Sequence, residues 1–93
     1  MKEVHVLINS YGYSNNAEGW DIVNIFESFD DAYDVMMNSH LEFIRDCDYG
    51  EHPDFIDYIS EVDDRLITVK SETSDAFERW IIESYLITEA KQK

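Results

Sequence analysis

The sequence is poor in the residues that cross-link, bend or interrupt a chain. Its 93 residues include one cysteine, one proline and three glycines. A single cysteine, Cys47, excludes an internal disulfide and a structural zinc site made of several cysteines. A small domain without such cross-links suggests a reducing compartment. Because glycine and proline are scarce, no internal linker is expected, and we predict a single domain over residues 1–93.

No signal peptide is expected from the first residues, and long apolar runs are also missing. Residues 1–10 hold one lysine and five apolar residues, too few for the apolar region of a signal peptide. No apolar stretch approaches the roughly 20 residues that span a bilayer. The hydrophobic content of 44% nevertheless supports a packed core and argues against disorder. We therefore expect a soluble, cytoplasmic chain that does not bind membranes.

Basic residues are the scarcest of the charged types. The chain has 7 Lys and Arg against 21 Asp and Glu, a formal net charge of −14. Since a magnitude of roughly 2–8 is enough for solubility, and self-repulsion destabilises the fold, this excess needs a further cause. Halophilic adaptation and a cationic partner are the two candidates. Direct nucleic-acid binding is not expected, because no basic track is present to contact phosphates.

The first third of the chain predicts a hairpin followed by a helix. Residues 4–9 alternate as in a half-buried strand, 11–19 are rich in turn residues, and 20–26 predict a pairing strand. Ser28 is a suitable helix N-cap, with Asp30 and Asp31 near the positive end of the helix dipole. The residues that we expect on the buried face of this helix are Tyr33, Met36, Met37, His40, Leu41 and Ile44.

The rest of the chain predicts a second helix and further strands. Pro53 is placed to begin a shorter helix that buries Phe55, Tyr58, Ile59 and Val62. Residues 65–71 predict a strand. Residues 77–88 favour a strand paired with 65–71, and a helix capped by Asp75 remains the alternative. The expected fold is α+β: a small antiparallel sheet with two or three helices packed on one face.

The negative charge is concentrated in one part of the sequence. Residues 27–64 contain thirteen acids and a single base, Arg45, so this window holds twelve of the fourteen net negative charges. Within it, the acids of the second predicted helix, Asp54, Asp57, Glu61 and Asp64, step by three, four and three residues. Those of the first, Asp31, Asp34, Glu42 and Asp46, follow one outer ridge, with Asn38 between Asp34 and Glu42. Like charges at that spacing destabilise a helix by a few tenths of a kcal/mol each, so helix stability does not account for the pattern.

Acids four residues apart on a helix are separated by about 6 Å of axial rise. This distance is of the same order as the spacing of phosphates along nucleic acid. The two ridges, Asp31, Asp34, Glu42 and Asp46 on the first helix and Asp54, Asp57, Glu61 and Asp64 on the second, could imitate two phosphate tracks. A solvated acidic face without a partner and a divalent-ion site are the alternatives. The side chains that we expect to contact a partner as phosphate mimics are Asp30, Asp31, Asp34, Glu42, Asp46, Asp48, Glu51, Asp54, Asp57, Glu61, Asp63 and Asp64.

Catalytic and metal-binding patterns are weak. An EF-hand that starts at Asp46 places Gly50 at position 5 instead of 6, so the register fails. His40, Asp46, Asp48 and His52 match no metal-ligand spacing. The acids beside Cys47 would raise the pKa of its thiol and reduce its reactivity as a nucleophile. We therefore expect no enzyme activity, no cofactor and no metal.

Three aromatic residues near the predicted hairpin, Tyr11, Tyr13 and Trp20, suggest a contact surface, because Tyr and Trp are enriched at interfaces. They suit a hairpin rim or the contact of a homodimer, which would lengthen the acidic track. An interaction module or small regulator that works through these aromatics is the alternative function.

The opening segment MKEVHVLINSYGYSNNAEGWDIVNIF, the two acid-ridged segments behind it, the length and the charge resemble the Arn anti-restriction proteins of T-even phages. The resemblance implies an acidic DNA mimic that acts in the host cytoplasm. Its partner would be a host DNA-binding protein, a restriction nuclease or a nucleoid-associated protein, whose DNA-binding surface it occupies. Membership of the wider class of phage anti-defence mimics, which includes anti-CRISPR inhibitors, would account for the same composition.

Overall fold

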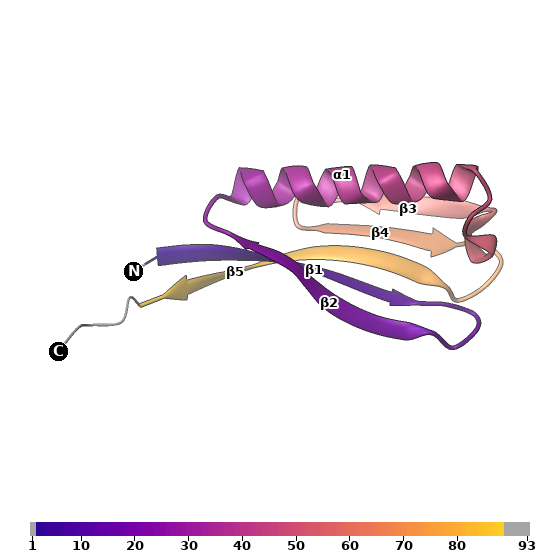
Figure 1. The fold of residues 1–93 in the computed structure, drawn as a ribbon, viewed down its shortest axis with the longest axis horizontal. Helices are drawn as coiled ribbons and strands as arrows, with labels where there is room; N and C mark the ends of the chain where they lie inside the picture. Colours follow the sequence, from indigo (N-terminus) through magenta and orange to yellow (C-terminus); the bar gives the residue numbers. More distant parts are fainter. Residues whose placement is uncertain (1, 89–93) are drawn as a thin grey trace.

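The computed structural model describes residues 2–88 and shows an α+β fold of one antiparallel sheet and one long helix (Figure 1). The strands are β1 (Lys2–Gly12), β2 (Glu18–Phe26), β3 (Tyr58–Val62), β4 (Leu66–Ser71) and β5 (Phe77–Ile87). They are ordered β2-β1-β5-β4-β3 in the sheet. The helix α1 spans Phe29–Asp48, and a 3-10 turn, η1, spans Pro53–Phe55.

The strand order explains why the helix covers one face of the sheet. β2 and β3 are the two edge strands, and α1 lies between them in the sequence. The chain therefore leaves one edge of the sheet, passes across a face as α1, and enters the other edge. The predicted hairpin of residues 4–9 and 20–26 is confirmed as β1 and β2, with a register shift between Leu7 and Ile8.

The C-terminal segment is a strand, as its β-branched and aromatic content favoured, and the helical alternative for 77–88 is wrong. β5 pairs with β4, as expected, and also with β1 along eleven residue pairs. It is thus a central strand of the sheet. Its residues alternate cleanly between the two faces, and Glu78, Trp80 and Ile82 are buried under the helix.

The helix begins where the sequence predicted. Ser28 is the N-cap, and its hydroxyl accepts a hydrogen bond from the backbone N–H of Asp31 at 3.3 Å. The buried face, however, differs from the predicted one. It consists of Ala32, Met36, His40, Phe43 and Cys47, while Leu41 is 54% exposed. Because each residue turns the helix by about 100°, Leu41 lies well off the line through Met36, His40 and Phe43.

The predicted second helix does not exist. Only the turn η1 is helical after Pro53, and Tyr58, Ile59 and Val62 lie in the edge strand β3. One helix, not two or three, therefore packs on the sheet. Phe55 anchors the segment in the core, where it lies edge-on to Phe43 with ring centroids 5.1 Å apart. Like charges at helical spacing and the β-branched residues of this segment both oppose a helix and favour the strand.

A single core fills the space between the helix, η1 and the sheet. Its largest fully buried side chains are Phe55, Leu7, Met36, Ile67 and Val69. Trp80 on the central strand lies edge-on to Phe43, with centroids 5.7 Å apart. All of these residues lie on the same side of the sheet, so the core positions α1 as a rigid outer layer whose far side faces solvent.

Candidate interaction surface of the helix and its neighbouring edge

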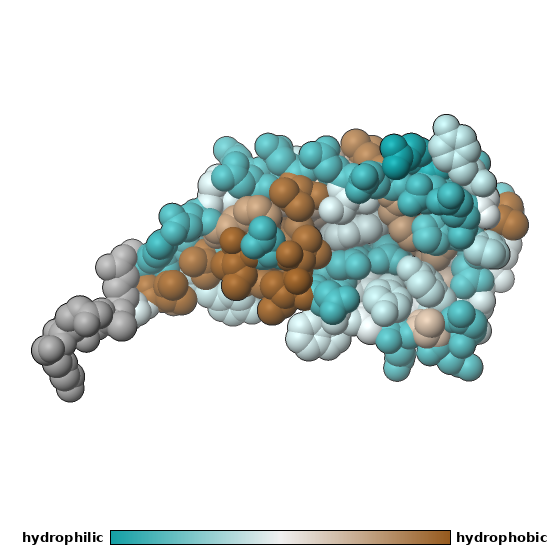
Figure 2. Space-filling view, viewed as in Figure 1, coloured by the Kyte–Doolittle hydropathy of each residue, from teal (hydrophilic) through white to brown (hydrophobic). Residues whose placement is uncertain are grey.

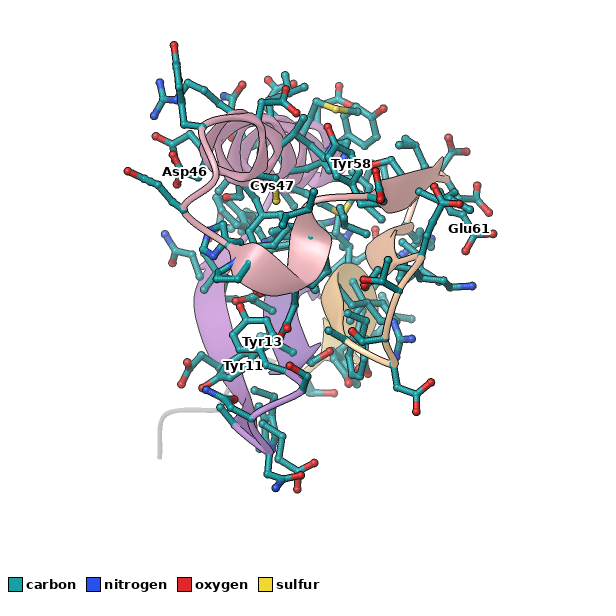
Figure 3. All side chains as sticks on the ribbon, turned by 90° about the vertical axis from the view of Figure 1, so that its right-hand side faces the viewer. Tyr11, Tyr13, Asp46, Cys47, Tyr58 and Glu61 are labelled. Carbon is teal, nitrogen blue, oxygen red and sulfur yellow. The ribbon has the colours of Figure 1, made fainter. Side chains whose placement is uncertain are left out.

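The outward side of α1 carries the first predicted acidic ridge. Asp31, Asp34 and Glu42 are exposed, and Asp46 is partly exposed on the same side. The helix is about 30 Å long at 1.5 Å per residue, so these acids extend over about 22 Å of its axis. In Figure 3, which looks along the helix, Asp46 points away from the protein, whereas Cys47 points into the core between helix and sheet.

The acids at the end of α1 lie in an unfavourable electrostatic position. Asp46 and Asp48 occupy the last turn, and Glu51 follows just beyond Gly50. The C-terminal end of a helix carries a partial negative charge that favours bases rather than acids. Arg45 is the one base in that turn, and its Nε lies 3.9 Å from the carboxylate of Asp46. This arrangement lowers helix stability, so helix stability does not account for the acids at these positions.

The second predicted ridge is not a ridge. Asp54 lies in η1, Asp57 follows it, and Glu61 is part of β3. Asp63 and Asp64 lie in the turn between β3 and β4. These acids therefore follow the edge of the sheet rather than a helix. Figure 3 shows Glu61 at the far edge, well away from Asp46 on the helix.

Two hydrogen bonds join this edge to the helix. His40 Nε2 on α1 lies 2.7 Å from Ser60 Oγ on β3, and the hydroxyl of Tyr58 donates to Asp48 at 3.0 Å. Burial, and then the bond to Asp48, raise the pKa of Tyr58. These bonds hold β3 near α1, but Glu61 follows Ser60 in the strand and therefore points to the other side of the sheet, so the acids of the edge do not continue the acids of the helix. We call the outward acids of α1, which are Asp31, Asp34, Glu42 and Asp46, the acidic face.

Few bases neutralise the predicted contact acids. Among residues 2–88, only two of the twelve predicted contact acids have a base within 4 Å: Asp46 with Arg45, and Glu61 with Lys70 at 2.7 Å. Lys70 was not foreseen as a partner of Glu61, because their pairing depends on the β3–β4 register, in which Ile59 lies opposite Lys70. Of the predicted contact acids, Glu61 therefore has the base closest to its carboxylate.

A hollow of about 260 Å³ opens beside Asp54, where the tip of the β1–β2 hairpin meets η1. The hydroxyl of Ser14 and its backbone N–H both donate to the Asp54 carboxylate, the latter at 3.0 Å. These bonds, the hydroxyl first, lower the pKa of Asp54 and hold its side chain in place. The ring of Tyr13 lines the same hollow. A fixed carboxylate beside an aromatic ring suits a guanidinium or ammonium group.

The three aromatics near the hairpin do not form one surface. Tyr11 and Tyr13 stack with centroids 5.2 Å apart, and the Tyr13 hydroxyl donates to the buried carboxylate of Glu78. Burial, and then this bond, raise the pKa of Tyr13. Trp20 pairs with Ser10, the neighbour of Tyr11 in β1, so it points to the opposite face of the sheet. The alternative interaction module based on all three side chains therefore has no common surface.

The residues considered for a metal do not converge. His40 is buried against Trp80, His52 stacks on Phe43, and Asp48 accepts from Tyr58. Within residues 2–88, no three His, Cys, Asp or Glu side chains are arranged to hold a metal ion. Burial first, and then Asp48 and Asp46, raise the pKa of the Cys47 thiol to about 11, in the direction that the sequence predicted. In the same part of the chain no helix is long and apolar enough to cross a membrane.

No family model, no curated protein and no solved structure matches this chain. The resemblance to the Arn proteins accordingly stays a prediction.

Proposed function

We propose that this protein is an acidic DNA mimic that inhibits a DNA-binding protein of the host by occupying its nucleic-acid-binding surface. The observation that supports it most strongly is the acidic ridge of α1, which runs outward along about 22 Å of a rigid helix with one base, Arg45, near its end. At 3.4 Å per phosphate along each strand, this length matches about six base pairs of duplex. The partner is a restriction nuclease or a nucleoid-associated protein in the host cytoplasm, in agreement with what the resemblance to the Arn proteins implies.

The placement of the acids supports a role in binding rather than in folding. Acids in the last turn of α1 oppose the helix dipole, and acids three or four residues apart repel each other. A chain that only needed solubility would have no reason to keep them at those positions. A cationic groove in the partner relieves this repulsion on binding, and the relief adds to the affinity.

The hollow beside Asp54 gives the proposed contact a specific element. An arginine of the partner fits there, with its guanidinium on the Asp54 carboxylate and its plane against Tyr13. Duplex DNA offers phosphates but no such aromatic wall. Through this site the protein distinguishes one cationic groove from another.

Affinity capture from a host lysate at low salt, with elution by duplex DNA, tests the proposal. We expect the immobilised wild-type chain to retain DNA-binding proteins that a short duplex releases. A variant with Asp34→Asn, Glu42→Gln and Asp46→Asn should retain at least tenfold less of them. A control with Glu18→Gln, Glu72→Gln and Asp75→Asn changes the net charge by the same amount but leaves the acids of α1 unchanged. This control should retain the DNA-binding proteins as the wild type does. Equal losses in the two variants would contradict the proposal, because they would mean that only net charge matters.

A further inference from the structure

The two faces of the sheet differ in what covers them. α1 and η1 both pack on one side, where Phe43 of the helix meets Phe55 of the turn. Within residues 2–88 no other helix remains for the opposite side, which we call the open face. In the strand register, one row of aliphatic side chains crosses the open face from edge to interior: Ile22, Ile8, Ile81 and Leu66, contributed by β2, β1, β5 and β4.

The open face exposes large apolar side chains. Trp20 is 66% exposed, Ile22 53% and Ile25 56%, and all three belong to the edge strand β2. In Figure 2, apolar side chains gather beneath the helix over the region where β2 crosses β1. Exposed apolar patches of this kind on a soluble protein mark an interaction surface. The edge of β2 also presents unpaired backbone groups, and no proline or lysine lies within the strand to protect it.

Charge on the open face is balanced, unlike that on the rest of the molecule. The strands place three bases there, Lys2, Lys70 and Arg79, and three acids, Glu18, Glu61 and Glu83. This is three of the five bases in the described residues, in a chain with a net charge of −14. A cationic partner gains nothing from such a surface. A second copy of the chain can approach it without strong repulsion, because equal numbers of acids and bases complement each other under a two-fold axis.

The size of the open face matches what a stable pair requires. The five strands have 11, 9, 5, 6 and 11 residues. At about 3.3 Å per residue and about 4.8 Å between strands, the face measures roughly 670 Å² in projection. A standard stable interface buries about 800 Å² on each partner. We propose that the open face is covered in solution by the open face of a second copy of this chain, in a sheet-on-sheet dimer.

The dimer places the two helices on opposite outer sides, so each acidic face remains free for a partner. It removes Trp20, Ile22 and Ile25 from water and brings bases such as Arg79 close to acids of the other copy. It also revises the expected homodimer contact: Trp20 takes part, whereas Tyr11 and Tyr13 lie on the helix side of the sheet. The proposal goes beyond the DNA-mimic function and does not depend on it.

The molar mass in solution tests the dimer in the absence of any target. Light scattering coupled to size-exclusion chromatography should give twice the chain mass of 11.0 kDa for the wild type. The double variant Ile22→Lys and Ile25→Lys should halve that mass. The control Leu41→Lys and Ile56→Lys places the same two charges on exposed apolar residues outside the open face, and it should remain dimeric. A wild-type mass of one chain would overturn the proposal, and so would a mass that grows steadily with concentration, which indicates strand-edge polymerisation.

A second measurement uses the wild type alone and does not depend on the folding of a variant. The chain has two tryptophans, and only Trp20 is exposed in a single copy, since Trp80 is 4% exposed. Acrylamide should therefore quench the tryptophan emission weakly in the dimer and severalfold more strongly after dilution into single chains. Quenching that is strong and independent of concentration would mean that Trp20 stays in water, and the open face would then be uncovered.

Discussion

The acids at the two ends of α1 give a sharp test of whether charge in this protein opposes folding. Asp30 lies in the first turn of the helix and Asp46 in the last. Asp30 has an acid four residues ahead, Asp34, and Asp46 has one four residues behind, Glu42. Replacing either by asparagine removes one like-charge pair at that spacing and one unit of net charge. The two changes differ in the end of the helix dipole at which they act.

Because the two variants lose the same net charge and the same kind of like-charge pair, the difference in their free energies of unfolding comes from the helix dipole. An acid contributes about 0.3–1 kcal/mol at the first turn and opposes folding by a similar amount at the last turn. Asp46→Asn also loses the contact with Arg45, an exposed pair at 3.9 Å that contributes at most a few tenths of a kcal/mol. We therefore expect Asp46→Asn to be more stable than Asp30→Asn by about 1 kcal/mol. For a domain of this size, that corresponds to about 4–8 °C in melting temperature.

Urea unfolding followed by circular dichroism at low salt measures this difference directly. The gap between the variants should narrow at high salt, since the charges are exposed and screened. If both variants shifted equally, net self-repulsion alone would govern stability and the dipole argument would be refuted. If Asp46→Asn were the less stable of the two, the acids at the end of α1 would support the fold. The case for their role in binding would then be lost.

Three further predictions concern the core. Phe55→Ala should lower the free energy of unfolding by about 3–5 kcal/mol, seen as a lower urea midpoint, because a fully buried ring that anchors η1 is removed; a change below about 1 kcal/mol would contradict the burial. Burial lowers the pKa of His40 from 6.5. The unfolded chain therefore binds a proton at His40 more readily than the folded chain does. The contribution of neutral, buried His40 to the free energy of unfolding should be fully present above about pH 6.5 and should decrease as the pH falls below that value. His40→Phe should flatten that slope between pH 7.5 and 5, and an unchanged slope would assign it to other groups. Because the pKa of Cys47 is raised to about 11 and the thiol is buried, its modification by a disulfide reagent at pH 8 should follow unfolding in urea; fast labelling of the folded protein would show that the thiol is accessible.

Much of the fold could be predicted because local signals agreed with it. Ser28 with the acids of the first turn marks the start of α1, and the alternation of residues 4–9 and 77–88 marks two strands. The strand order could not be predicted. β5 pairs with β1, at the other end of the sequence, and no local pattern specifies such a long-range partner.

The segment after Pro53 shows where periodicity misleads. Phe55, Tyr58, Ile59 and Val62 have helical spacing, yet only Phe55 belongs to the buried core. Tyr58 faces the helix, and Ile59 faces the open side of the sheet, as neighbours in a strand must. The acids of this segment that lack a basic partner indicate a strand instead, because like charges at helical spacing destabilise a helix more than they destabilise an exposed edge strand.

The acidic positions could be found from sequence, whereas the open face required the structure. Exposure of Asp34 and Glu42 follows from their place opposite the core of α1. The open face does have a sequence signal: in residues 4–8 both sets of alternating positions are apolar apart from His5, which is typical of a strand covered on two sides. One helix covers one side, and the dimer that we propose covers the second.

The central claim is that the acidic face and duplex DNA occupy the same surface of the partner. Fluorescence anisotropy of a labelled short duplex, bound to a protein captured by the wild-type chain and titrated with that chain, tests it most directly. We expect the anisotropy to return to that of free duplex, with an apparent dissociation constant of this protein that rises linearly with the duplex concentration. A ternary complex, in which the duplex stays bound while this protein binds beside it, would contradict the account.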